Sequence, residues 1–205
     1  MFDVISAVDQ KYEVVKGAMT PLGLYSTLYK HSASGHVLVF DDCDVVLQDD
    51  LSLNLLKAAL DSGRKRRVCW NADSHLLRRE GIPNSFDFEG SVIFITNLKF
   101  NHIRSKKLQD HLEALQSRCH YLDLTLDTMR DKLLRVRQIA ETGELFNDYN
   151  LSDKQGKEII AFMEKHKNEL REMSLRMALK IADLCTISEK RWKLLAKNTC
   201  MKNSF

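Results

Sequence analysis

The chain has 205 residues, of which 44% are hydrophobic and 29% charged, a balance that excludes disorder as its main state. Glycine (8) and proline (2) are scarce, which disfavours an all-β sandwich and favours long helices. No apolar stretch approaches the ~18 residues of a membrane span, and the N-terminus lacks the basic start and apolar core of a signal peptide. We therefore expect a cytoplasmic protein without membrane contact, whose five cysteines are reduced thiols.

Charge is distributed unevenly along the chain. Residues 1–150 contain 19 Lys and Arg against 21 Asp and Glu, whereas residues 151–205 contain 12 against 7. The basic end is a solvated helical surface in one interpretation and a contact surface for a polyanion in the other.

The first 125 residues alternate strand-like and helix-like patterns. We predict strands at residues 12–17, 36–44, 68–71, 86–97 and 119–124, with helices at 20–31, 49–62 and 105–117. Continuously apolar strands in such an alternation indicate a parallel sheet covered on both faces. Residues 1–125 are therefore predicted to form an α/β core.

The remainder of the chain is predicted to be helical. Helices are expected at residues 128–142, 153–166, 174–183 and 188–200. Asp127 is the expected cap of the first of these helices, and Ser152 with Gln155 fits a capping box at the second. Residues 126–205 are therefore predicted to be a small all-α domain or lid.

The most informative motif is VLVFDDCD, in which four apolar residues run directly into Asp41 and Asp42. Carboxylates at the carboxyl end of a buried parallel strand lie at the edge where such sheets bind ligands. One of them can hold Mg²⁺ while the other orients or deprotonates an attacking water. A strand followed by an ordinary acidic turn gives the same pattern.

Three further residues follow in a suggestive order. Asn97 ends the predicted strand SVIFITN, where its amide can bridge a water to a phosphate. Arg118 lies at a helix end, suited to reaching a neighbouring subunit, and Arg176 lies near the start of a later helix. The alternatives are a turn asparagine, a helix-terminal cation and a surface arginine.

Together these motifs resemble the AAA+ ATPases, and the strings VFDDCDVVLQDDLSLNLLKAALDSGRKRR, NSFDFEGSVIFITN and SLRMALKIADL are similar to AAA+ proteins of tailed bacteriophages. The resemblance implies a parallel-sheet P-loop NTPase core, with ATP and Mg²⁺ as cofactors. It implies Walker B roles for Asp41 (metal) and Asp42 (catalytic), and sensor 1 for Asn97. Arg118, in a Ser-Arg-Cys triplet like that of clamp loaders, matches the arginine finger, and Arg176 matches sensor 2. It also implies a homo-oligomer or a partner AAA+ subunit.

Two features depart from that family. The acidic motif ends Asp-Asp instead of Asp-Glu, which places the catalytic carboxylate about one methylene further from the water. No G-x-x-x-x-G-K-[ST] occurs, so the phosphate-binding loop is absent. Residues 2–8 have the pattern of the end of the helix that follows such a loop, and we expect a core lacking its first strand and P-loop.

These features lead to competing functional hypotheses. In the first hypothesis, the chain is the Walker B-to-lid part of an ATPase that remodels or loads something on DNA, and it is inactive on its own. In the second hypothesis, the chain is a nucleotide-free scaffold or regulator that donates Arg118 to a partner. A third hypothesis, a DNA-binding protein unrelated to ATPases, depends on the basic C-terminal end and the run Arg64, Lys65, Arg66 and Arg67. The alternative interpretation of this run is a solvated turn.

Overall fold

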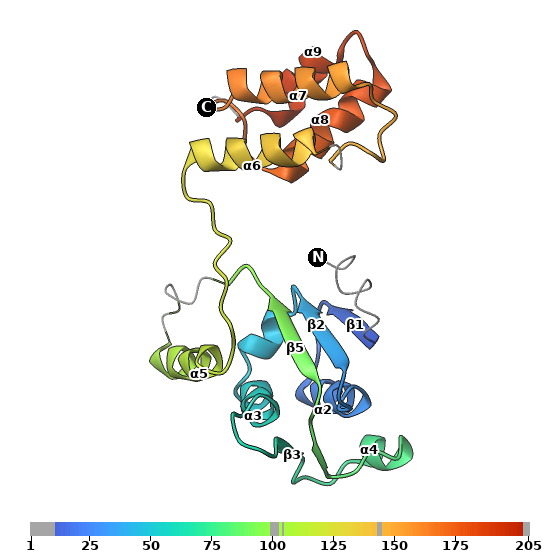
Figure 1. The fold of residues 1–205 in the computed structure, drawn as a ribbon, viewed down its shortest axis with the longest axis vertical. Coiled ribbons are helices and arrows are strands. Elements are labelled where there is room, and N and C mark those ends of the chain that lie inside the picture. Colours follow the sequence, from blue (N-terminus) through green and yellow to red (C-terminus); the bar gives the residue numbers. More distant parts are fainter. Residues whose placement is uncertain (1–10, 99–102, 104, 143–144, 203–205) are drawn as a thin grey trace. The chain divides into compact units, whose positions relative to one another are not determined.

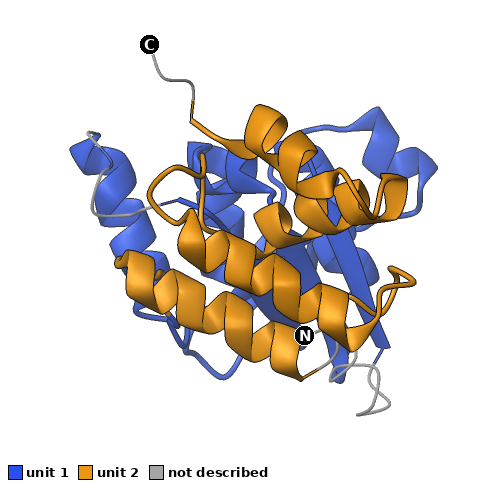
Figure 2. Ribbon diagram, turned by 90° about the horizontal axis from the view of Figure 1, so that it is seen from above, with its two compact units in different colours: residues 1–122 blue, residues 123–205 orange. Residues whose placement is uncertain are grey.

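The computed structural model describes residues 11–98, 103, 105–142 and 145–202. The chain divides into two compact units, residues 1–122 and 123–205 (Figure 2). The first contains a parallel sheet with its helices, and the second is helical (Figure 1). The helix end predicted at residues 2–8 lies outside the described residues.

A three-stranded parallel sheet organises the first unit. It consists of β1 (Lys11–Lys16), β2 (His36–Asp41) and β5 (Ser91–Ile95), in the order β1-β2-β5 (Figure 1). Residues 37–40 of the central strand are all buried, which explains why this strand is continuously apolar instead of alternating.

Alternate residues of the sheet face the main hydrophobic core of this unit. Leu38 and Phe40 of β2 join Phe94 of β5 there. They pack with buried leucines from three helices, α2 (Pro21–Lys30), α3 (Asp50–Ala59) and α5 (Lys106–Gln116). All three helices were predicted, within a few residues of their observed bounds.

The connection from β2 to β5 is more elaborate than predicted. It adds a 3-10 turn, η1 (Asp44–Leu47), helix α4 (His75–Arg79) and strand β4 (Ser85–Asp87). Strand β4 pairs antiparallel with β3 (Arg67–Cys69), which corresponds to the strand predicted at residues 68–71. The extended segment predicted at 86–97 is therefore two strands, β4 and β5. Gly90 separates them where the backbone passes so close to His31 that a Cβ atom at position 90 would lie 2.5 Å from the His31 carbonyl oxygen.

The strand predicted at residues 119–124 is not formed. All six residues are exposed and irregular, with Leu122 and Leu124 75% and 78% exposed. An apolar alternation forms a strand only where a neighbouring strand satisfies its backbone groups. Within the described residues, β5 is paired with β2 alone, so its other edge offers the backbone groups that a further strand would use.

The second unit consists of four helices, α6 (Met129–Glu141), α7 (Asp153–Lys165), α8 (Leu175–Ile187) and α9 (Trp192–Cys200), within its described residues. Its core includes the fully buried Ile159, Met163 and Ile181. The capping box of Ser152 and Gln155 at α7 is confirmed. The prediction that Asp127 caps α6 is wrong, because the Thr128 side chain accepts the hydrogen bond from the Asp131 backbone N–H.

The five cysteines are free, and three of them (Cys43, Cys185 and Cys200) are buried. None of the helices in the described part of the chain combines the length and apolarity needed to cross a bilayer.

Candidate functional site

The carboxyl ends of the three parallel strands bring together the polar residues of the candidate site. Asp41 is the last residue of β2, and Asn97 follows β5 by two residues. The Nδ2 atom of Asn97 donates a hydrogen bond to Oδ1 of Asp42 at 3.0 Å. Two side chains that are 55 residues apart in sequence therefore meet at one edge of the sheet.

The backbone at Asp42 turns sharply. Its φ is +54°, in the left-handed region that Asp adopts more readily than most residues other than glycine. The Asp42 backbone N–H donates to the Ile95 carbonyl at 3.0 Å, continuing the pairing of β2 with β5 for one more residue. Asp42 is thereby held at the sheet edge by its backbone, while its exposed side chain reaches Asn97.

Asp41 has a partner that sequence reasoning did not identify. The Lys16 Nζ atom lies 2.8 Å from Oδ2 of Asp41, whose side chain is 18% exposed. The hydrogen bond with Asp41, followed by the attraction of that carboxylate, raises the pKa of Lys16 above its ordinary value. Lys16 is the register partner of Asp41 across β1 and β2, so only the strand register could have revealed the pair.

Three more hydrogen bonds fix the segments that follow the strands. The Thr96 hydroxyl donates to Oδ1 of Asp44, and the Leu98 backbone N–H donates to the Thr96 hydroxyl oxygen at 3.0 Å. The Cys43 thiol donates to the Val15 carbonyl at 3.3 Å, and burial raises the pKa of this thiol. The acidic turn is therefore tied to both neighbouring strands, which favours a single geometry for its carboxylates.

Arg118 lies away from this cluster, at the C-terminal end of α5. Its Nε atom is 3.7 Å from Oδ1 of Asp61, and it donates to the Ala114 carbonyl. Its side chain is 29% exposed. The predicted arginine finger thus contacts its own chain, through an ion pair near the upper distance limit for such contacts.

Arg176 lies in the helical unit, exposed on the first turn of α8. The following residues, Met177 and Ala178, are buried. Its role as a sensor of bound nucleotide stays a prediction.

Among the described residues, two members of the basic run at residues 64–67 make side-chain hydrogen bonds within the fold, and the other two do not. Arg66 donates to the Gly90 carbonyl at 2.9 Å and lies over the Phe88 ring, and Arg67 donates to the Ser85 hydroxyl. These two side chains stabilise the β3–β4 region. Arg64 and Lys65 are exposed and are the two members of the run that stay available to a phosphate.

The edge cluster fits part of a magnesium–nucleotide site. Mg²⁺ in such sites is held by one or two carboxylates together with the substrate phosphates, and Asp41 with Asp42 supplies the carboxylates. No group of three or more His, Cys, Asp or Glu side chains in the described ranges is arranged to hold a metal ion. The sequence contains no Gly-rich loop with a following Lys to surround phosphates. Asp41 and Asp42 could therefore supply the carboxylate ligands of such a site, whereas the sequence contains no loop that would bind the phosphates.

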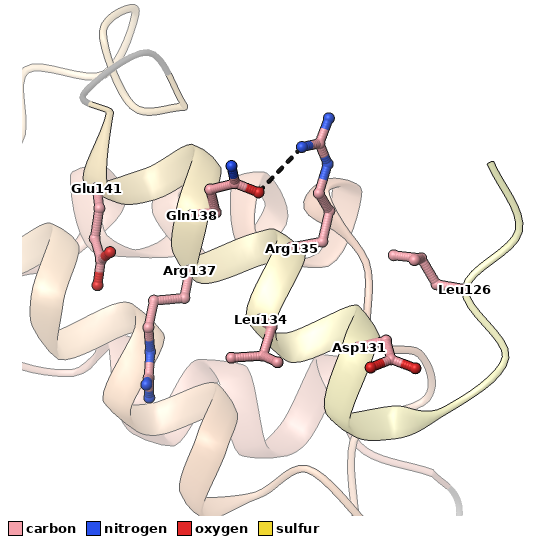
Figure 3. A pocket seen from close by; sticks show the side chains of 7 residues that line it. All are labelled: Leu126, Asp131, Leu134, Arg135, Arg137, Gln138 and Glu141. Carbon is pink, nitrogen blue, oxygen red and sulfur yellow. Dashed lines mark hydrogen bonds between the residues drawn. The ribbon is translucent and has the colours of Figure 1, made fainter.

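Open hollows are also present among the described residues of the helical unit. The first has a volume of about 490 Å³, and Figure 3 shows its lining side chains on α6 and the preceding segment: Leu126, Asp131, Leu134, Arg135, Arg137, Gln138 and Glu141. Arg135 donates to Gln138, and Arg137 donates to Glu164. Both arginines are thus engaged by the helices themselves. The second, of about 610 Å³, is lined by Ile139, Leu145, Asp148, Tyr149, Leu179 and Asp183.

The chain is similar to a protein of Enterobacteria phage T4 described as an uncharacterized 36.7 kDa protein in the nrdC-mobD intergenic region. The two are 37% identical over 188 residues, which cover 91% of this chain and 58% of the T4 protein. The chain thus spans less than two thirds of that relative's length, and the similarity supports a protein of phage type. No protein-family model and no solved structure matches the chain.

Proposed function

We propose that this chain provides the Walker B-to-lid part of an AAA+ ATPase that couples ATP hydrolysis to remodelling or loading on DNA in a phage-infected cell. The observation that carries the proposal is the hydrogen bond between Asn97 and Asp42 at the carboxyl edge of a parallel sheet. In AAA+ proteins, an acidic residue and a polar sensor from neighbouring strands occupy the corresponding edge.

The order of the strands supports the same proposal. AAA+ sheets have the order 5-1-4-3-2, and β5, β2 and β1 follow one another as strands 4, 3 and 2 of that order would. The strand that carries the P-loop would then lie along the free edge of β5. We infer that a longer form of the protein or a partner subunit supplies this strand and the loop.

The chain's own residues have distinct roles in this proposal. Bound Mg²⁺–ATP supplies the phosphoryl group and the neutralising charge. Asp41 would hold the metal ion, and Asp42 would orient the attacking water and accept its proton. Asn97 fixes the Asp42 carboxylate through the observed hydrogen bond. Asp41 is already paired with Lys16, so binding of a metal at that oxygen requires Lys16 to move.

A second candidate function is a nucleotide-free scaffold that donates Arg118 to an active neighbour. It is favoured by the absence of any G-x-x-x-x-G-K-[ST] sequence. In that function the Asp61–Arg118 contact, at 3.7 Å, would open when the neighbour binds.

Titration with a fluorescent ATP analogue in the presence of Mg²⁺ separates the two functions. The chain alone is expected not to bind in the micromolar range. Adding a strand–loop–helix fragment that carries G-x-x-x-x-G-K-[ST] is expected to create Mg²⁺-dependent binding, which a Lys→Ala fragment does not. Micromolar binding by the chain alone contradicts the incomplete site, and failure of the fragment favours the scaffold.

A further inference from the structure

The last helix carries a strip of basic side chains. We define the α9 stripe as Lys190, Arg191, Lys193 and Lys197, which begin just before α9 and continue along its exposed surface. Residues 190–202 contain five Lys and Arg and no Asp or Glu. The stripe therefore has no negative charge of its own segment to compensate it.

Two acidic side chains lie near the stripe: Glu158 on α7, and Glu189 directly before Lys190 in the chain. Glu158 pairs with Lys193 at 3.2 Å, and Glu189 accepts a hydrogen bond from Gln155. Within the part of the chain that the structure describes, no ion pair or side-chain hydrogen bond engages Lys190, Arg191 or Lys197. These three cations are thus free to meet an external anion.

The stripe has more free cations than the basic run at residues 64–67. Arg66 and Arg67 of that run are held by contacts within the fold. Lys190 and Arg191 precede α9 and Lys197 lies within it, so the three free members are separated by at most seven residues, or ~10 Å at the helical rise. Duplex DNA presents roughly six phosphate charges over that length. Lys and Arg side chains clustered along a helix are the charge pattern that binds a phosphodiester backbone.

We propose that the α9 stripe binds the phosphate backbone of duplex DNA without reading its sequence; only the choice of DNA as the polyanion rests on the proposed function. Trp192 is buried at 4% exposure beneath Lys193, so it offers no face for stacking on single-stranded bases. The cations therefore carry the contact, and the exposed Leu194 beside them contributes little.

Fluorescence anisotropy of the full chain with a labelled duplex of about 24 base pairs, over roughly 50 to 200 mM salt, tests this proposal. The test variant is Lys190→Gln with Arg191→Gln and Lys197→Gln. The matched control is Arg130→Gln with Lys132→Gln and Arg135→Gln, which removes the same charge from α6. Circular dichroism melts establish that both variants are folded.

The native chain and the control are expected to bind alike, within about twofold. The stripe variant is expected to bind at least about tenfold more weakly at low salt, with a salt slope smaller by roughly three. Leu194→Ala is expected to bind as the native chain does.

The proposal is overturned if the stripe variant and the control lose binding equally, or if the native chain does not bind the duplex. If the native chain binds polyglutamate and Leu194→Ala weakens that binding, the α9 stripe would instead be a surface for an acidic protein. DNA binding is measured without nucleotide, so the result can be interpreted even if the chain is not part of an ATPase. Conversely, failure to bind DNA does not test the nucleotide site.

Discussion

Asn97 Nδ2 and Asp42 Oδ1 are 3.0 Å apart although 55 residues separate them in sequence. The contact exists because β2 and β5 are parallel neighbours, so that both segments leave the sheet at the same edge. Asp42 turns out of the strand with a left-handed backbone. The sheet thus creates a carboxylate–amide pair that neither segment specifies alone.

Changing Asn97 tests this pair. Asn97→Ala should lower the free energy of unfolding by about 1 kcal/mol, because one hydrogen bond between exposed groups is lost. Asn97→Asp should cost more at neutral pH, because two carboxylates then face each other, and the extra cost should disappear in acid. Urea unfolding at neutral and acidic pH measures both. Equal stability of the two variants at neutral pH contradicts the contact.

Lys16 should stabilise the fold only while it is charged. Its pKa is raised in the folded protein by Asp41, so its contribution is complete below the ordinary lysine pKa and is lost as the pH rises through the raised value. In Lys16→Met, the free energy of unfolding should therefore decrease less as the pH rises through the alkaline range. Lys11→Met, on the same strand, is the control and should leave that loss unchanged, as measured by urea midpoints over the alkaline range.

The sequence predicted much of the first unit and missed parts for physical reasons. Long apolar runs such as residues 37–40 identify buried strands, and the polar residue after each strand marks the edge. Strand β3 was predicted at residues 68–71, but the three-residue strand β4 is too short to show a period and was merged with β5 in the prediction. The Lys16–Asp41 pair depends on strand register, which the local pattern does not contain. Residues 119–124 have a strand pattern, but secondary structure there depends on a partner strand.

Residues 119–124 should promote self-association. Leu122 and Leu124 are largely exposed, and the outer edge of β5 is unpaired within the described residues. We expect the isolated chain to be oligomeric or poorly soluble, and Leu122→Lys with Leu124→Lys to shift it toward monomer. Sedimentation velocity measures this, with Leu194→Lys as the control for an added charge elsewhere. A native chain that is monomeric at high concentration contradicts this expectation.

Gly90 should tolerate no side chain. A Cβ atom there would lie 2.5 Å from the His31 carbonyl oxygen and 3.3 Å from that of His36. Gly90→Ala should therefore destabilise the first unit by about 1–3 kcal/mol, the usual cost of overpacking. Gly63→Ala is the control, because its nearest neighbour is the movable Asp61 side chain. Similar urea midpoints for the two variants would show that the backbone at position 90 yields easily.

The measurement that tests the ATPase proposal most directly is steady-state Mg²⁺–ATP hydrolysis by the chain together with the strand–loop–helix fragment, comparing native Asp42 with Asp42→Asn. The variant keeps the size of the side chain and an oxygen that can accept the hydrogen bond from Asn97, and it removes the base. We expect that the nucleotide still binds to the Asp42→Asn variant and that hydrolysis falls about 10²-fold or more. Hydrolysis that is unchanged in Asp42→Asn would contradict the role of Asp42, and with it the assignment of this edge of the sheet as the catalytic site.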